Sequence, residues 1–282
     1  METHKEIHSE FEDITRKHNS MPIFIFAAGW RSGSTFLQRM IISTHQALIW
    51  GETMGGINLL ANAALLYKDS LAGPDDPRSM DGVTGNGGEQ FRQFLNAGKY
   101  GAHKWIANLN PPLETVYEAF RSILKALYAN TALQLGYPRW GIKEVQSGIE
   151  TANFLRLLYP DAKFIFLVRN PLDCLTSIKR RNWIGRANDR NRLRFYATHW
   201  ARLAREFRHA DFGYLLRYED LLAQDGIIKQ LQDYLEIEGL SKEFAQQSRV
   251  DWPSYNEQPL TLQEKLFAIW LLKREMAYHG YV

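Results

Sequence analysis

Cysteine and long apolar runs are what this 282-residue sequence has least of. Cys174 is the only cysteine, which excludes an internal disulfide and any metal cluster built from several thiolates. The longest apolar stretches, such as Phe164–Val168, are far shorter than the roughly 20 residues that a membrane-spanning helix needs. We therefore expect a protein without a membrane span, and the lone cysteine favours a reducing, cytoplasmic location.

The chain also lacks a strong charge of either sign. Its formal net charge of +3 does not suit a nonspecific nucleic-acid binder, so a local anion site is the more natural expectation. Residues 1–20 are a polar leader without the apolar segment of a signal peptide. Its histidines, His4, His8 and His18, could in principle bind a metal. Scattered histidines on a polar leader are usually solvated, and we expect no metal site.

Short apolar runs alternate with amphipathic segments along the chain, as in α/β proteins. The expected strands cover 22–28, 47–51, 139–145, 162–168 and 213–217. The expected helices cover 35–44, 113–135, 151–158, a segment starting at Pro171, 193–208 and most of the remainder to 278. Glycine and proline mark 68–88 as a mobile loop. These patterns predict a P-loop-like central parallel β-sheet flanked by helices on both faces, in one domain over 1–282.

A glycine-rich turn, Gly29-Trp-Arg-Ser-Gly-Ser-Thr35, joins the first expected strand to the first expected helix. Unpaired backbone N–H groups and the helix dipole make such a turn an anion site. It is not a Walker A loop, because Gly29 and Gly33 are only four apart and Ser34 stands where the lysine would be. The turn disfavours a kinase or NTPase. A purely structural turn closing a βα unit is the alternative.

A second anion site is indicated where the strand over 162–168 ends. Arg169 comes directly after this strand, and Ser177 follows eight residues later. Between them, Asn170 and Pro171 supply an N-cap and a first-turn proline for a helix. An arginine fork and a hydroxyl that converge on one phosphate give a charge-assisted site. Each residue alone would be unremarkable on a surface, but together with the glycine-rich turn they form a specific pattern.

These motifs resemble those of sulfotransferases that use 3′-phosphoadenosine 5′-phosphosulfate (PAPS). The turn Arg31–Thr35 is similar to the family's 5′-phosphosulfate loop, and Leu167–Asp173 with Ser177 is similar to its 3′-phosphate site. Leu216–Leu222 resembles the strand end where a tyrosine approaches the nucleotide, although a strand-end tyrosine is often part of the core. The resemblance implies PAPS as co-substrate, no metal, and these cofactor-binding residues: Arg31, Ser32, Gly33, Ser34, Thr35, Arg169, Ser177 and Tyr218.

The catalytic residues are implied by one branch of that family. Arg31–Glu52 is similar to the protein-tyrosine sulfotransferase pattern, in which the glutamate of a Gly-Glu pair is the base. The resemblance makes Glu52 the base, with Lys143 and Arg31 as the cations on the bridging and sulfuryl oxygens. Cytosolic small-molecule sulfotransferases use a histidine base instead, which keeps His103 and His45 as alternatives.

Structural ion pairs are the competing interpretation of both charged candidates. Glu52 could simply pair with a nearby arginine, and Lys143 could pair with Glu144 or Glu150. The resemblance covers about half the chain, and the unmatched regions would shape the acceptor pocket. The glycine-rich segment with which cytosolic relatives bind the 3′-phosphate has no match. A basic stretch could replace it, or could be a solvated helix face: Lys179, Arg180, Arg181 and Arg186.

The acceptor is the least defined part of the prediction. The membrane anchor and paired cysteines of Golgi tyrosine sulfotransferases are missing, which weakens the case for protein tyrosine. We expect sulfuryl transfer to a hydroxyl or amine of a small, natural-product-like molecule of secondary metabolism. Carbohydrate and peptide tyrosine stay open as alternative acceptors. A noncatalytic sulfotransferase-like protein that only binds the nucleotide stays open as an alternative to the enzyme. Four tryptophans could line an aromatic pocket or belong to the core: Trp105, Trp140, Trp183 and Trp200.

Overall fold

The computed structural model describes residues 21–70, 113–184, 189–243 and 259–281. The chain divides into two compact units, one of residues 1–55 and 128–282 and one of residues 56–127. Every described residue that was predicted to form the site belongs to the first unit. The single domain over 1–282 stays a prediction.

The first unit is built on a five-stranded parallel sheet with the order β2-β3-β1-β4-β5. The strands are β1 (Ile23–Ala27), β2 (Leu48–Trp50), β3 (Trp140–Glu144), β4 (Lys163–Val168) and β5 (Tyr214–Arg217). Each lies inside the range predicted for it. The order places β1 at the centre, between β3 and β4, so the glycine-rich turn after β1 lies between the ends of two neighbouring strands.

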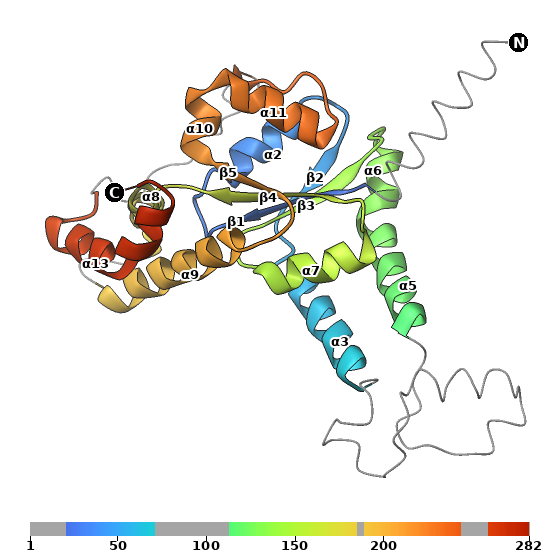
Figure 1. Cartoon of the computed structure of the whole chain (residues 1–282), viewed down its shortest axis with the longest axis horizontal. Helices are drawn as coiled ribbons and strands as arrows, with labels where there is room; N and C mark the ends of the chain where they lie inside the picture. The colour runs from blue at the N-terminus through green and yellow to red at the C-terminus, as the bar shows by residue number, and fades with distance from the viewer. Residues whose placement is uncertain (1–20, 71–112, 185–188, 244–258, 282) are drawn as a thin grey trace, which may run out of the picture. The chain divides into compact units, whose positions relative to one another are not determined.

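Helices cover both faces of this sheet, as Figure 1 shows. One face carries α2 (Ser34–Ile42), α10 (Tyr218–Ala223) and α11 (Asp225–Leu235), and the other carries α7 (Ile149–Leu158) and α9 (Arg190–Arg208). At the end of the sheet, α8 (Pro171–Arg180) follows β4, and α13 (Leu262–Tyr278) packs against α8 and α9. The predicted α/β fold with a doubly covered parallel sheet is confirmed.

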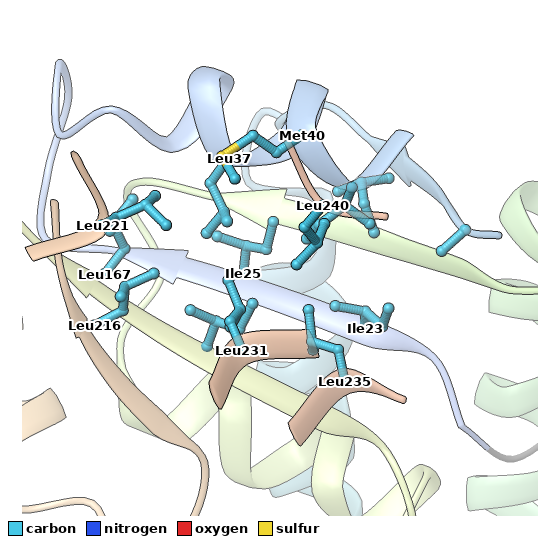
Figure 2. Close-up of a cluster of buried hydrophobic side chains, with 14 of the residues drawn as sticks. Ile23, Ile25, Leu37, Met40, Leu167, Leu216, Leu221, Leu231, Leu235 and Leu240 are labelled. Atoms are coloured by element: carbon cyan, nitrogen blue, oxygen red, sulfur yellow. The ribbon is translucent and has the colours of Figure 1, made fainter. Parts of the chain in front are cut away.

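Alternate residues of the strands enter two different apolar layers. On the side of α2 and α11, Ile23 and Ile25 of β1 pack with leucines such as Leu37 and Leu231 (Figure 2). On the side of α9, the buried phenylalanines of β1 and β4 form a ring cluster with Phe207, whose ring lies 5.0 Å from that of Phe166. Burial on both faces explains why these strands read as uninterrupted apolar runs.

Two local expectations need correction. The region predicted as one regular helix over 113–135 consists of α5 (Leu113–Leu124), a π-helical segment (Lys125–Ala129) and α6 (Asn130–Gln134). Within the π segment, the carbonyl of Tyr128 accepts a hydrogen bond from Trp50 Nε1 at 3.1 Å, a partner from β2 that helical periodicity does not reveal.

The loop expected over 68–88 begins later than predicted. The helix α3 (Gly56–Ser70) includes residues 68–70, while 71–88 lie outside the described residues. Among the helices described, none is long and apolar enough to cross a membrane.

Candidate functional site

A pocket of about 850 Å³ opens at the carboxyl ends of the strands. In a parallel α/β sheet this edge is where ligands bind, because the loops and helix N-termini that follow the strands meet there. The predicted site residues in its lining are Arg31, Gly33, Ser34, Thr35, Glu52, Arg169, Ser177 and Tyr218. Two others, Ser32 and Lys143, lie buried behind that lining.

The glycine-rich turn is held in an unusual backbone conformation. Arg31 has φ 64° and Gly33, the N-cap of α2, has φ 88°. A Cβ added to Gly33 would lie 2.2 Å from Cδ2 of Tyr218, so the tyrosine ring packs directly on the glycine. Only glycine fits this close approach. Ser34 and Thr35, which carry the first backbone N–H groups of α2, line the pocket.

The two predicted anion sites are directly connected. Arg31 Nε donates a hydrogen bond to Ser177 Oγ at 2.9 Å, and Arg169 Nη1 donates to the carbonyl oxygen of Arg31 at 3.1 Å. The thiol of Cys174 also approaches that carbonyl, at 3.6 Å. Burial raises the pKa of Cys174 to about 12, so its role here is structural and not nucleophilic. The turn after β1 and the helix after β4 thus form one site.

Arg169 is oriented by several neighbours and has a hydrogen-bond donor that no described residue uses. Its guanidinium lies 4.7 Å from the centre of the Tyr218 ring, in a cation–π arrangement. Its Nε is buried and has no hydrogen-bond partner among the described residues. The predicted cap is present as well, since the side chain of Asn170 accepts from the N–H of Leu172 and Pro171 opens α8. Buried donors without a partner are rare in folded proteins, so this Nε is a donor that the described residues leave unused.

Glu52 and Lys143 form an ion pair with each other. Lys143 Nζ lies 2.8 Å from Glu52 Oε1, and the lysine side chain is 6% exposed against 29% for the glutamate. Lys143 stands on β3 and Glu52 follows the neighbouring strand β2, so the pairing results from the strand order. The competing interpretation expected Glu52 to pair with an arginine and Lys143 to pair with Glu144 or Glu150. The structure instead pairs the two candidates with each other, and Glu52 lines the pocket.

The residues that follow Glu52 and Lys143 make a second link, between the segment after β2 and the end of β3. Glu144 accepts hydrogen bonds from the backbone N–H of Thr53, at 2.9 Å, and from its hydroxyl. Burial raises the pKa of the Glu144 carboxyl, and the charge of Glu52 adds to the rise, while the bonds from Thr53 oppose it. Glu144 thereby fixes the backbone beside Glu52.

Several pocket residues were not predicted as site residues. Phe36 and Arg39 of α2 and Trp30 of the turn line the pocket, and so does Arg180 of α8, which was named only as part of a basic stretch. Trp30 is the second residue of the turn, and its ring lies 4.8 Å from that of His199, whose pKa is lowered mainly by burial. The helical spacing of Phe36 and Arg39 with the turn could have indicated them; nothing in the sequence indicates that Trp30 turns toward the pocket.

The four candidate tryptophans do not lie together. Trp183 lines the pocket, whereas Trp140 and Trp200 are buried in the core. Trp105 lies outside the described residues.

The basic stretch on α8 is not simply a solvated face. Lys179 is buried and pairs with Glu264 of α13 at 2.5 Å, while Arg180 lines the pocket. Arg186 and the candidate base His103 lie outside the described residues. His45 is exposed, with its ring stacked 6.2 Å from Tyr137. In the described ranges, no three histidine, cysteine or acidic side chains gather as a metal site would require.

The fold and the pocket define an α/β protein with an arginine-lined pocket at the carboxyl edge of its sheet. A family model described as "Sulfotransferase family" matches residues 22–241, which include this site. The chain therefore belongs to the sulfotransferase family, as its motifs suggested.

Solved structures of similar fold include further sulfotransferases. The sulfotransferase domain of the Synechococcus PCC 7002 olefin synthase is 16% identical, with 91% of this chain and 94% of that one covered and a TM-score of 0.47. A sulfotransferase from Alicyclobacillus acidocaldarius is 14% identical, with 92% and 94% covered and a TM-score of 0.45. Retinol dehydratase, solved with androsterone and inactive cofactor PAP, is 15% identical, with 94% and 84% covered and a TM-score of 0.41. No curated protein matches the chain.

Proposed function

We propose that this chain is a sulfotransferase that uses PAPS to sulfate a hydroxyl or amine of a small-molecule acceptor. The observation that carries the proposal is one pocket whose lining combines Glu52, the partner of Lys143, with a phosphate-loop-like turn and an arginine–serine site. When bound, PAPS supplies an activated sulfuryl group on a phosphate. Family membership supports the sulfuryl chemistry, and the residues described below support this particular donor.

The pocket fits the charge of this donor. Arg31, Arg39, Arg169 and Arg180 line it, against the carboxylates Glu52 and Asp173. The buried Nε of Arg169 has no hydrogen-bond partner among the described residues. Four guanidinium groups against two carboxylates leave an excess of positive charge in the lining, which suits a ligand with several negative groups.

Each residue then has a role that its position allows. Arg169 and Ser177 would bind the 3′-phosphate, and the N–H groups at the start of α2 would bind the 5′-phosphosulfate. The Tyr218 ring, packed on Gly33, would contact the nucleoside. Arg180, one turn after Ser177 on α8, would supply a further cation at the 3′-phosphate end.

The chemistry is assigned to the pair between β2 and β3. The Glu52 carboxylate would accept the proton that the acceptor loses as it attacks, which is general-base catalysis. Lys143 and Arg31 would stabilise the negative charge that develops on the leaving phosphate oxygen and the sulfuryl oxygens. Such transfer depends mainly on positioning and charge stabilisation, as in phosphoryl transfer. We also propose a natural-product acceptor and a cytoplasmic setting, which the single buried thiol of Cys174 supports.

The decisive experiment compares two nucleotides that differ only in the 3′-phosphate. Calorimetric titration should show adenosine 3′,5′-bisphosphate (PAP) binding far more tightly than 5′-AMP. Arg169→Ala should remove most of that preference, because hydrogen bonds to charged groups contribute about 1.5–3 kcal/mol each. Equal affinities in the wild-type protein would refute the donor assignment. Labelled PAPS with phenols, amines, sugars and tyrosine peptides would then identify the acceptor class.

A further inference from the structure

The backbone that carries Arg169 is fixed from both sides of one peptide unit. Its carbonyl oxygen accepts a hydrogen bond from Trp200 Nε1 of α9 at 3.1 Å. The next N–H, from Asn170, donates to Glu219 Oε1 of α10 at 2.9 Å. Both polar groups of this peptide unit are therefore used, and two helices from different layers of the fold determine how the guanidinium enters the pocket.

A tyrosine from the segment after α13 supports both of these anchors. Tyr281 donates its hydroxyl hydrogen to Glu219 Oε2 at 3.0 Å, and its ring lies 6.4 Å from that of Trp200. The Arg217 guanidinium lies 4.8 Å from the centre of this ring, in a cation–π arrangement. Burial raises the pKa of the Tyr281 phenol and the charge of Glu219 adds to the rise, so the hydroxyl stays protonated and available as a donor.

We propose that Tyr281, acting through Glu219, is a positioning residue for Arg169 and thereby sets the preference of the pocket for a 3′-phosphorylated nucleotide. This inference rests on the proposed function. Tyr281 itself is not part of the pocket lining, so the effect of its hydroxyl reaches the ligand through the sequence of contacts Tyr281–Glu219–Asn170. The family motifs end at Leu222, and this residue lies far beyond them.

The geometry explains why such support is needed. Arg169 makes one hydrogen bond through Nη1, to the Arg31 carbonyl, while its Nε is buried and unused among the described residues. The guanidinium must be held so that its free donors point at one phosphate, and a tilt of the Arg169–Asn170 peptide would misdirect them. A carboxylate that accepts from both Asn170 and Tyr281 is restrained at each oxygen, which fixes the tilt.

The test measures PAP and 5′-AMP affinities for the wild-type protein, Tyr281→Phe and Glu219→Gln. Tyr281→Phe keeps the ring and removes one hydroxyl, and we expect PAP to bind roughly 5- to 10-fold more weakly while 5′-AMP changes by less than about 2-fold. Tyr278→Phe is the matched control, since this tyrosine lies three residues earlier, is exposed, and stacks under Arg208 outside the site. It should leave both affinities unchanged.

A double variant separates positioning from general destabilisation. If Tyr281 acts only through Glu219, the double change should weaken PAP binding no more than Glu219→Gln alone does. An unchanged PAP preference in Tyr281→Phe, or an equal loss for both nucleotides, overturns the inference while leaving the proposed function intact. A wild-type protein without any preference for PAP overturns the proposed function, and the inference with it.

Discussion

Glu52→Gln tests the proposed base most directly, because the change keeps the shape of the side chain and removes its ability to accept a proton. If Glu52 takes the acceptor proton, kcat should fall by roughly 10²- to 10⁴-fold, the usual contribution of general-base catalysis. PAP affinity should change little, since the nucleotide is assigned to the turn, Arg169 and Ser177. The loss should therefore appear in kcat and not in donor binding.

The structural cost of the same change is smaller and can be separated. Lys143 Nζ lies 2.8 Å from Glu52, with side-chain exposures of 6% and 29%. Removing one charge of a fully buried pair costs about 3–5 kcal/mol, but here the glutamate is partly exposed at a pocket and glutamine keeps an oxygen for the ammonium. We expect about 1 kcal/mol, which lowers the Tm by about 2–4 °C in a chain of this size.

A matched control uses another lysine–glutamate pair. Glu236 accepts from Lys163 at 3.0 Å, and Lys163 begins β4 at the opposite end of that strand from Arg169. Glu236→Gln should produce a comparable small change in Tm with an unchanged kcat. The assay is kcat at saturating PAPS and acceptor, with Tm from calorimetry. A Glu52→Gln protein with near-native kcat would refute the assignment and move the base role to another group, with His103 the next to test.

Three further outcomes are expected. Gly33→Ala should abolish nucleotide binding in titrations, because the new Cβ would lie 2.2 Å from the Tyr218 ring at a φ of 88°; retained affinity would contradict the packing. EDTA should leave PAPS-dependent turnover intact, since the turn lacks the Walker lysine and arginines would balance the negative charge of the donor. A loss of turnover that magnesium specifically restores would favour the hypothesis of a kinase-like protein. Burial raises the pKa of Glu144 above its ordinary 4.5, so ionising this carboxyl in the folded protein costs stability. The Tm of the wild-type protein should therefore fall relative to that of Glu144→Gln as the pH rises from about 4.5 to neutral. Parallel plots of Tm against pH for the two proteins would contradict this.

Local signals were sufficient to predict the five strands and the start of α8. The apolar run of β4 and the Asn170-Pro171 cap are encoded within a few residues, and both occur as predicted. The turn after β1 also occurs as predicted, although α2 begins one residue earlier than expected, at Ser34, with Gly33 as its N-cap. These features depend on backbone geometry and on neighbours along the chain, which a single sequence contains.

Contacts between distant segments could not be predicted in this way. Lys179 is followed by two arginines, a pattern typical of a basic surface. In the structure it is buried against Glu264, 85 residues later in the chain. Glu52 and Lys143 are 91 residues apart, and their pairing depends on β2 lying beside β3. Side-chain periodicity fixes which face of an element is apolar but not which charged group a second element brings to it.

The strand order also arranges the proposed roles in space. Along the carboxyl edge, Glu52 follows β2, Lys143 lies on β3, the turn at Arg31 follows β1, Arg169 follows β4 and Tyr218 follows β5. Read in that order, the edge runs from the proposed base through the sulfuryl cations and phosphate turn to the 3′-phosphate and nucleoside contacts. In a sheet ordered as the chain runs, Lys143 would neighbour Arg169 and the turn after β1 would lie at an outer strand. A central β1 flanked by β3 and β4 places the turn between the two, which is why Arg31 can donate a hydrogen bond to Ser177 while the lysine–glutamate pair lies on the turn's other side. In the proposed function, this position would let one turn contact both ends of a long donor.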